Sequence, residues 1–356
     1  MLNSFEILLL FREKAAVYNF CPSFKDLLAI VQTVISCRIV RSMLYFFRER
    51  EDDLSATTLP FFSIFMHMNR KRGLMNSYQI KSQENGLLVS GLRDFSLPQI
   101  LDCGQCFRWT PVDGDETHWQ GFAMGRKLSI EQQGENCFFF SPCSVEEFEQ
   151  IWTPYFDLDC DYSAIKRALC CDPIMREATG YAPGIRVLKQ DGWETLCTFI
   201  ISQNNNIKRI RGIVERFCQL FGEERNGGFD FPTAQRLASA TLEDLAPLRA
   251  GFRAKYLLDA AQKVASAEVD LSLIPQLPYE EASALLQKIH GVGPKVADCT
   301  LLFGFYRLDA FPLDVWMKRA MKTLYPQGLP SEILPYRGIA QQYLFHYSRM
   351  HPELFE

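Results

Sequence analysis

Two residues within 290–320, HGVGPKVADCTLLFGFYRLDAFPLDVWMKRA, could do chemistry together: Lys295 and Asp314. Lys295 follows directly after a Gly-Val-Gly-Pro turn, and Asp314 lies nineteen positions later between a Leu and a Val. A lysine amine can attack a sugar carbon and form a Schiff base. A carboxylate held near that carbon can stabilise the positive charge that develops as the leaving group departs. The pair therefore indicates nucleophilic catalysis at a sugar.

Each of the two residues also has a simpler explanation. A lysine behind a glycine-rich turn can contact a phosphate without reacting with it. Asp314 directly precedes VWMKRAM, which makes it a natural helix N-cap. Taken alone, each residue favours the simpler role. Because a lysine nucleophile needs a carboxylate near the sugar, the presence of both favours catalysis.

The residues around Lys295 predict the element that positions it. YEEASALLQKI has the periodicity of an amphipathic helix, HGVG is a tight turn, and PKVADCTLLFGF is a second helix. Gly291 and Gly293 permit positive φ angles and a close approach of the backbone to a ligand. The free N–H groups of the turn and of the second helix suit a DNA phosphate. We therefore expect a DNA-contacting helix-hairpin-helix at about 279–304.

Composition limits the possible functions. The chain has 356 residues and a formal charge of −4, so a nucleic-acid partner would have to bind a local basic patch. Its 12 cysteines include one C-x-x-C, Cys103 and Cys106, without a second pair at zinc-ribbon spacing. Only Cys299 follows Lys295, which excludes a four-cysteine iron–sulfur loop there. We expect no metal and no organic cofactor.

Residues 1–74 differ in character from the rest. FEILLLF, DLLAIVQTVISCRIV and LPFFSIFMHM are apolar patches, and none reaches the roughly 18–20 residues needed to span a bilayer. Met75 begins MNSYQIKSQENGLLVSGL, which reads like an ordinary domain start. Two interpretations stay open: translation starts at Met75 and 1–74 is an upstream artefact, or 1–74 is a genuine helical or membrane-peripheral extension. Without a recognisable secretory signal, we expect a cytoplasmic protein, associated with the nucleoid in bacteria or nuclear in a eukaryote.

The remaining residues predict an α+β fold. GLLVSGL, CFRWT, HWQGFAM, KLSIEQQ and NCFFF are short, partly alternating and separated by turn-forming residues, as in a small antiparallel sheet. Ser144 followed by Glu147 is a capping box at the start of a helix. Helical periodicity recurs in GWETLCTFIISQ, IKRIRGIVERFCQLF and RAKYLLDAAQKVASA. We expect an antiparallel β-rich domain over 75–160 and helical domains over 161–356.

Four stretches, in order, resemble one enzyme family. GVGPKVADC followed by FPLDV is similar to the helix-hairpin-helix, Gly/Pro-rich loop and aspartate signature of the base-excision DNA glycosylases. CGQCFRW (103–109), SQNNNIKRIRGIVERFCQLFG (202–222) and QYLFHYSRMHP (342–352) narrow the resemblance to the 8-oxoguanine DNA glycosylase family. The similarity covers roughly residues 86–352.

The resemblance implies a fold and an activity. The family has a TATA-protein-like antiparallel β domain followed by an all-α, two-lobed helix-hairpin-helix glycosylase domain. The implied reaction is excision of 8-oxoguanine opposite cytosine, with β-elimination at the abasic site as an associated lyase activity. Because a side chain cannot reach C1′ inside a stacked duplex, the damaged nucleotide must flip into a pocket. We expect a monomer whose partner is double-stranded DNA containing a damaged base.

The resemblance also implies roles for individual residues. Lys295 matches the family's nucleophile, and Asp314 matches the aspartate that assists glycosidic cleavage. Gly104 matches a glycine whose carbonyl accepts a hydrogen bond from N7–H of the base. That hydrogen exists in 8-oxoguanine and is absent in guanine, so one acceptor separates the lesion from the normal base.

Further matched positions would hold the base and the DNA. Cys299 and Phe345 match residues that sandwich the flipped base, and Gln341, or its neighbour Gln342, matches a glutamine at the Watson–Crick edge. Asn204 matches an asparagine that enters the duplex and contacts the cytosine left behind, and Arg209 and Arg253 match arginines that also hold that cytosine. Phe252 takes the place of a tyrosine that wedges the opposite strand.

Three positions depart from the family pattern. His290 stands where the hairpin commonly has a proline, which we expect to be tolerated. Trp316 replaces a histidine near phosphate in the animal enzymes, and Ser348 replaces an aspartate near the pocket. The change at Ser348 alters the polar network of the pocket and favours a looser preference for cytosine.

Two rival functions remain. One is a glycosylase of the same superfamily for alkylated or other oxidised bases, which would ordinarily lack Lys295 or carry iron–sulfur cysteines. The other is a non-enzymatic DNA-binding protein that uses the hairpin only for phosphate contacts. The second rival leaves the pairing of Lys295 with Asp314 unexplained.

Overall fold

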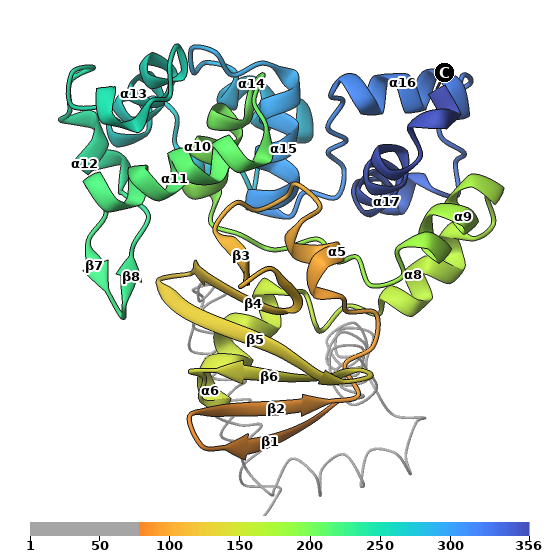
Figure 1. Ribbon diagram of the computed structural model, residues 1–356. Helices are drawn as coiled ribbons and strands as arrows, with labels where there is room; N and C mark the ends of the chain where they lie inside the picture. Colours follow the sequence, from red (N-terminus) through yellow and green to blue (C-terminus); the bar gives the residue numbers. More distant parts are fainter. Residues whose placement is uncertain (1–77, 356) are drawn as a thin grey trace, which may run out of the picture. The chain divides into compact units, whose positions relative to one another are not determined.

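A computed structural model describes residues 78–355 of the chain. The predicted extension over 1–74 and the alternative start at Met75 lie outside these residues. The described part has a six-stranded antiparallel sheet followed by helices (Figure 1). The expected order, an antiparallel β domain before helical domains, is confirmed. No helix in the described part is long and apolar enough to cross a membrane.

The sheet has the spatial order β1-β2-β6-β5-β4-β3. Its strands are β1 (Gln79–Gln83), β2 (Gly86–Ser90), β3 (Trp109–Val112), β4 (Asp115–Ala123), β5 (Arg126–Gly134) and β6 (Cys137–Ser141). Side chains along each strand alternate between the two faces of the sheet, and one face is buried. On that face Val89 pairs with Phe138 and Leu87 pairs with Phe140, and all four side chains are buried. Strand β1 was not predicted from sequence because QIKSQ is exposed at four of its five positions and lacks a buried stripe.

Short helices cover the buried face of the sheet. They are α5 (Leu97–Leu101), a π-helical turn (Phe148–Trp152) and α7 (Thr153–Tyr155). The short α6 (Val145–Glu147) leads into the π-helical turn and buries no residue of its own. The predicted capping box is confirmed, because Ser144 accepts from the Glu147 amide and Glu147 accepts from the Ser144 amide. Trp109 lies against Trp152 and donates its indole N–H to the Tyr155 hydroxyl at 2.9 Å.

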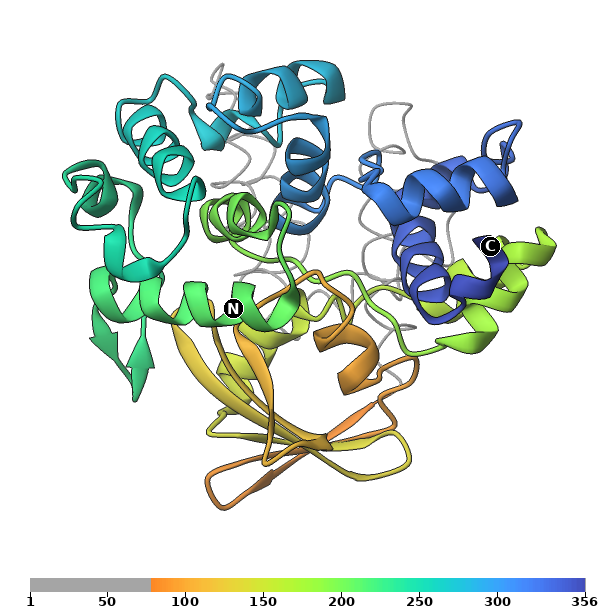
Figure 2. The ribbon, with the colours of Figure 1, turned by 45° about the horizontal axis from the view of Figure 1, so that its top comes forward.

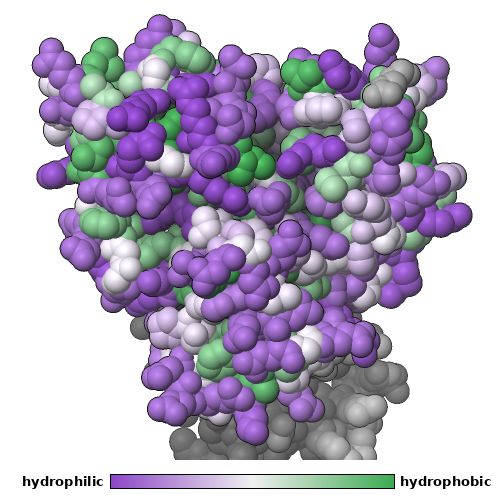
Figure 3. Space-filling model, in the orientation of Figure 1, coloured by the Kyte–Doolittle hydropathy of each residue, from purple (hydrophilic) through white to green (hydrophobic). Residues whose placement is uncertain are grey.

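The remaining helices form two groups above the sheet (Figures 1 and 2). The first group holds α10 (Gly192–Ser202), α11 (Ile207–Phe221), α12 (Ala234–Ala238), α13 (Arg253–Ala265), α14 (Tyr279–Leu286) and α15 (Pro294–Phe305). The second holds α8 (Tyr162–Leu169), α9 (Pro173–Tyr181), α16 (Val315–Leu324) and α17 (Arg337–Met350). Minor elements are the hairpin β7 (Glu224–Arg225) and β8 (Gly228–Phe229) and the 3₁₀ turns Ala246–Leu248, Leu271–Leu273, Leu334–Tyr336 and Pro352–Phe355. The surface is notched between the two groups, and polar residues cover most of this face (Figure 3).

The predicted hairpin lies at α14 and α15. Helix α15 spans the twelve residues of PKVADCTLLFGF, as predicted, with Pro294 in its first turn. Gly291 has φ +82°, and a Cβ added there would lie 2.4 Å from the Tyr256 ring. Gly293 differs from the expectation, because its φ of −100° is ordinary extended backbone at the N-cap of α15. Only Gly291 therefore uses a glycine's conformational freedom in this turn.

The sheet domain and the helices share their cores. Phe107, from the loop after α5, packs among the helices, and Leu188, from the segment before α10, packs into the core of the sheet domain. The loop of residues 102–108 is thus fixed from both sides. It carries Gly104, one of the predicted site residues.

Candidate active site

A cavity of about 40 Å³ brings the predicted catalytic and base-pocket residues together. Residues from both helical groups and from the loop after α5 line it: Gly104, Phe199, Lys295, Cys299, Phe303, Pro312, Asp314, Gln341, Gln342 and Phe345. All six residues that the sequence assigned to catalysis and base recognition are among them. They come from positions as distant as 104 and 345, so only the fold unites them.

Lys295 extends along an aromatic wall. It is half-buried in the first turn of α15, and its Nζ lies 5.0 Å from the centre of the Phe199 ring. Phe199 stacks on Phe303 with ring centres 5.5 Å apart. Cys299 and Phe303 follow Lys295 at four-residue steps on the same face of α15. The helix therefore presents an amine, a thiol and an aromatic ring to one cavity.

Asp314 caps α16 and faces the cavity at the same time. Its Oδ1 accepts a hydrogen bond from the Met317 amide at 2.8 Å, which is the predicted N-cap contact. Within residues 78–355, its other carboxylate oxygen accepts no hydrogen bond. The side chain is half-buried and lines the cavity with Lys295. One oxygen is thus held by the helix while the other is available to a substrate.

Gly104 occupies a conformation that favours glycine. Its φ is +82°, and a Cβ added there would lie 3.4 Å from Cε1 of Phe345. The ring of Phe345 therefore lies next to the Gly104 backbone. The Gly104 carbonyl accepts no hydrogen bond from any residue in the described part of the chain.

The two adjacent glutamines of α17 have different surroundings. Gln341 is buried, donates from Nε2 to the Pro312 carbonyl at 3.2 Å, and leaves its Oε1 without a partner among the described residues. Gln342 donates from Nε2 to the Cys103 carbonyl at 3.1 Å. The free acceptor on Gln341 suits the N–H groups at the Watson–Crick edge of a guanine-type base.

Cys299 is a neutral thiol in this site. It is buried beside Lys295, and burial raises the pKa of the thiol to about 11, an effect that the Lys295 charge partly opposes. A neutral thiol acts as a small polarisable surface rather than as a nucleophile.

The three asparagines before α11 make different contacts. Asn206 caps α11 by accepting from the Arg209 amide at 2.9 Å, and Asn205 donates to the Ile201 carbonyl at the end of α10 at 3.1 Å. Asn204 is exposed with φ +46°, and its side chain has no hydrogen-bond partner within 78–355. Of the three, Asn204 is the one whose side chain is free to contact a ligand.

The two predicted opposite-strand arginines lie in different environments. Arg209 is exposed, and so is Phe252, which has 48% of its surface accessible. Arg253 is only 2% exposed, and its guanidinium stacks on Phe252 with 4.4 Å between the guanidinium carbon and the ring centre. It donates to the backbone carbonyls of Gln203, Asn204 and Ala250. In this structure Arg253 therefore holds the turn that carries Asn204.

The hairpin turn presents unused backbone donors. In the described part of the chain, the amides of Gly291, Gly293 and Lys295 donate no backbone hydrogen bond, and no side chain caps α15. The His290 amide is instead bound by the Asp259 carboxylate at 2.7 Å. Free amides at the start of a helix favour an anion such as phosphate.

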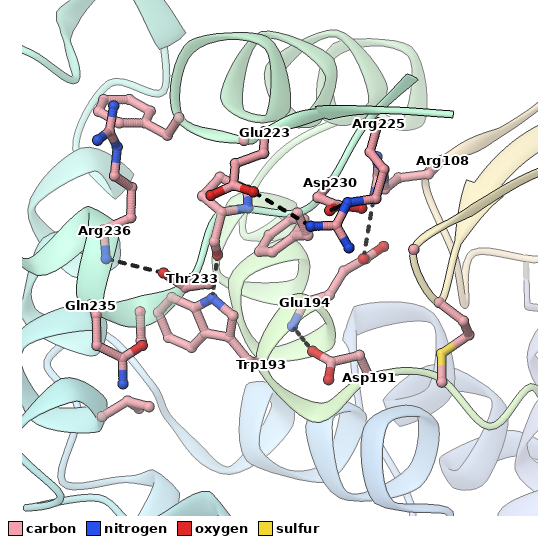
Figure 4. Close-up of a pocket in the computed structure, with 18 residues that line it drawn as sticks. Arg108, Asp191, Trp193, Glu194, Glu223, Arg225, Asp230, Thr233, Gln235 and Arg236 are labelled. Atoms are coloured by element: carbon pink, nitrogen blue, oxygen red, sulfur yellow. Dashed lines mark hydrogen bonds and ion pairs between the residues drawn. The ribbon is translucent and has the colours of Figure 1, made fainter. Parts of the chain in front are cut away.

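A larger cavity, of about 720 Å³, lies elsewhere and holds none of the predicted site residues (Figure 4). Among its charged side chains, Arg108 pairs with Glu194 at 3.3 Å, and Arg225 pairs with Asp230 at 3.0 Å. Asp191 caps α10. The predicted catalytic and base-pocket residues gather at the smaller cavity instead, so the cavity around Lys295 is the better candidate for chemistry.

Sequence reasoning missed part of the cavity wall. Phe199, Phe303 and Pro312 line the cavity but were not predicted. The spacing of Phe303 after Cys299 could have identified it, whereas Phe199 looks like any core residue of an apolar helix. Ser348 is fully buried with no partner for its hydroxyl among residues 78–355, and the exposed Trp316 stacks with Arg319. The described residues contain no cluster of three or more potential metal ligands.

Comparisons with known proteins agree with this geometry. Residues 87–196 match the model of the 8-oxoguanine DNA glycosylase N-terminal domain, and residues 197–331 match that of the HhH-GPD superfamily of base excision DNA repair proteins. An N-glycosylase/DNA lyase of Saccharomyces cerevisiae is 30% identical over 270 residues, which are 68% of this chain and 72% of the yeast protein.

Two solved structures are similar over most of their length. The structure of MBOgg1 in complex with a low-affinity DNA ligand is 39% identical, with a TM-score of 0.71 over 78% of this chain and 99% of that one. The Clostridium acetobutylicum 8-oxoguanine glycosylase/lyase, in complex with double-stranded DNA containing cytosine opposite 8-oxoG, is 36% identical. Its TM-score is 0.70 over 77% of this chain and 98% of that one. The chain therefore belongs to the 8-oxoguanine DNA glycosylase family, whose members are N-glycosylase/DNA lyases with a helix-hairpin-helix base-excision repair domain.

Proposed function

We propose that this protein excises 8-oxoguanine opposite cytosine from double-stranded DNA, with Lys295 as a Schiff-base nucleophile and with associated lyase activity. The observation that carries the proposal is the convergence of Lys295, Asp314 and the free Gly104 carbonyl on one cavity. The activities named for the yeast and clostridial relatives support it.

Lys295 must first give its proton to solvent, so that its amine has a lone pair for the attack. The Nζ lone pair of Lys295 attacks C1′ of the flipped nucleotide, the C1′–N9 bond breaks, and the base leaves with the bonding electrons and takes up a proton. The free carboxylate oxygen of Asp314 stabilises the positive charge on the sugar as that bond breaks. The C1′–O4′ bond then breaks, and O4′ takes up the proton that Nζ gives up. This ring opening leaves an iminium between Nζ and C1′. Loss of a C2′ proton then expels the 3′ phosphate oxygen, which nicks the strand.

The lesion is distinguished by one hydrogen bond. The Gly104 carbonyl accepts from N7–H of 8-oxoguanine, while guanine would bring its N7 lone pair against the same oxygen. An acceptor facing an acceptor in a water-poor pocket is unfavourable, so guanine is rejected. Gln341 Oε1 accepts from the Watson–Crick edge of the base.

The cavity must widen to admit a base. A volume of about 40 Å³ holds little more than one water molecule. Phe345 is half-buried and lies against Gly104, so its side chain has to move aside before the base can fit between it and Cys299.

The remaining predicted residues bind the opened duplex. The free amides of Gly291 and Gly293 bind a backbone phosphate without reading sequence. Asn204, held by Arg253, enters the space left by the flipped base, with the exposed Arg209 and Phe252 beside the orphaned cytosine. One chain supplies all these residues, so a monomer is sufficient for the proposed reaction.

Borohydride trapping tests the proposal. A duplex with one 8-oxoguanine opposite cytosine is incubated with wild-type protein or with Lys295→Gln, and borohydride reduces any imine to a stable covalent adduct. We expect base release and an adduct with wild type, and neither with Lys295→Gln, because the amide cannot attack C1′.

Other results would exclude parts of the proposal. Base release by wild type without an adduct would identify water as the nucleophile. No release from 8-oxoguanine duplexes but release from alkylated ones would reassign the substrate. If wild type shifts the 8-oxoguanine duplex on a native gel but gives neither base release nor a covalent adduct, the protein is a non-enzymatic DNA-binding protein.

A further inference from the structure

Gln105, the residue after Gly104, is buried although it is polar. Only 1% of its surface is exposed. Its Nε2 donates to the carbonyls of Ile100 at 2.9 Å and Arg186 at 2.8 Å, and its Oε1 accepts from the Leu188 amide at 2.9 Å. One side-chain amide thus joins the end of α5 to the segment that precedes α10. Such a fully satisfied buried amide fixes local geometry.

The peptide groups on both sides of Gly104 are also held. The Gln105 carbonyl accepts from Gln190 Nε2 at 2.7 Å, and the Cys103 carbonyl accepts from Gln342 Nε2 at 3.1 Å. Between these two anchored carbonyls lies that of Gly104, which has no partner within the described residues. The anchors restrict the direction in which the free carbonyl can point.

Gly104 itself cannot supply this restriction. It has no side chain to pack, and a glycine at φ +82° can move to other conformations at little steric cost. Hydrogen bonds weaken steeply as donor and acceptor lose alignment. A carbonyl that must tell N–H from a lone pair therefore depends on neighbours that hold it in place.

We propose that Gln105 is a positioning residue for lesion specificity, which fixes the Gly104 carbonyl so that the pocket prefers a purine with N–H at position 7. This inference rests on the function proposed above. Gln105 does not line the cavity and acts only through Gly104. Strand cleavage at a preformed abasic site needs Lys295 but no base recognition, so it should not depend on Gln105.

This difference provides the test. Gln105→Met keeps the size and burial of the side chain. It removes the hydrogen bonds to the three backbone groups and also the one from Nε2 to Cys103 Sγ at 3.4 Å. Single-turnover rates are measured on two duplexes, one with 8-oxoguanine and one with a preformed abasic site, both opposite cytosine. We expect excision of 8-oxoguanine to fall about tenfold to a hundredfold, in line with the effect of displacing a binding group by about 1 Å. Abasic-site cleavage should stay within about threefold.

Gln99→Met is the matched control. Gln99 Oε1 accepts from the Gly184 amide at 2.7 Å, so it joins the same helix to the same segment without contacting the loop of Gly104. We expect this variant to keep the wild-type ratio of the two rates. Thermal melting of both variants reports any general loss of stability.

The outcomes separate the two proposals. Equal losses on both duplexes with Gln105→Met, or no loss on either, would overturn the positioning role and leave the proposed activity intact. A wild-type protein that cleaves abasic sites but releases no 8-oxoguanine would overturn the proposed function, and the positioning role with it. A drop in the excision-to-cleavage ratio confined to Gln105→Met supports both.

Discussion

At the scale of single residues, Asp314 caps a helix, and its proposed catalytic role can be separated from the cap by substitution. One of its oxygens caps α16 through the Met317 amide, and the other faces the cavity. Asparagine caps helices about as well as aspartate does but carries no charge. The sequence suggested both roles, and the geometry shows why one side chain can serve both.

We predict that Asp314→Asn keeps the stability of wild type within about 0.5 kcal/mol, while Asp314→Ala loses about 0.5–2 kcal/mol. Base excision should fall by at least about a hundredfold in both variants, since both lack the charge that stabilises the sugar cation. Chemical denaturation and single-turnover excision measure the two effects. Full activity in Asp314→Asn would reduce Asp314 to a helix cap.

Cys299 should be unreactive despite its place beside Lys295. Burial raises the pKa of its thiol to about 11, above the ordinary value of about 8.5 for a free cysteine. Because the folded pKa is raised, the stabilisation from burying the neutral thiol is complete below about pH 8.5 and is lost as the pH rises through about 11.

We therefore predict that iodoacetamide at pH 8 modifies the exposed Cys171 and leaves Cys299 unmodified. Peptide mass spectrometry over a time course gives both rates within one sample, with Cys171 as the internal reference. Modification of Cys299 at the rate of Cys171 would show that the thiol is accessible and ionised.

At the scale of elements, the hairpin turn contains two glycines with different demands. A Cβ at Gly291 would collide with the Tyr256 ring, and the φ of +82° is strained for any other residue. A Cβ at Gly293 would meet nothing within 4 Å and would sit on ordinary extended backbone. The two positions allow stability and DNA binding to be tested separately.

Gly291→Ala should lower the free energy of unfolding by about 1–3 kcal/mol through overpacking and backbone strain. Gly293→Ala should change it by less than about 0.5 kcal/mol, as for an unstrained surface site. Because the open space beside Gly293 is where we place the phosphate, Gly293→Ala should still weaken binding to duplex DNA several-fold. Unchanged binding by a stable Gly293→Ala protein would remove the turn from the DNA interface.

The same elements show what the sequence could predict. Helix α15 was predicted to the residue because Gly, Pro and an apolar run mark its start and course. Strand β1 was missed because it is fixed by pairing with β2 rather than by a buried stripe. The anchoring of the Asn204 turn by Arg253 was missed since its partners are backbone carbonyls, which residue types do not reveal.

At the scale of the whole molecule, Arg186 connects the sheet domain to the helices. It is 4% exposed, and its guanidinium carbon lies 4.5 Å from the ring centre of Tyr162 in α8. It donates to the carbonyls of Asp94 and Asp157 in the sheet domain, at 2.7 Å each. A single side chain thus satisfies backbone groups of one domain while packing on the other.

We predict that Arg186→Met uncouples the unfolding of the two parts. The change leaves buried carbonyls unpaired at a cost of about 1–3 kcal/mol each. In wild type, the slowest amides of β5 and α15 should exchange hydrogen through one global opening, with equal free energies of exchange. In the variant these two free energies should diverge by about 1 kcal/mol or more, because each part can then open alone. Arg167→Met, which alters an exposed arginine of α8, should leave them equal. If the free energies of exchange of β5 and α15 stay equal in Arg186→Met but are both lower than in wild type, the arginine stabilises the molecule without coupling its two parts.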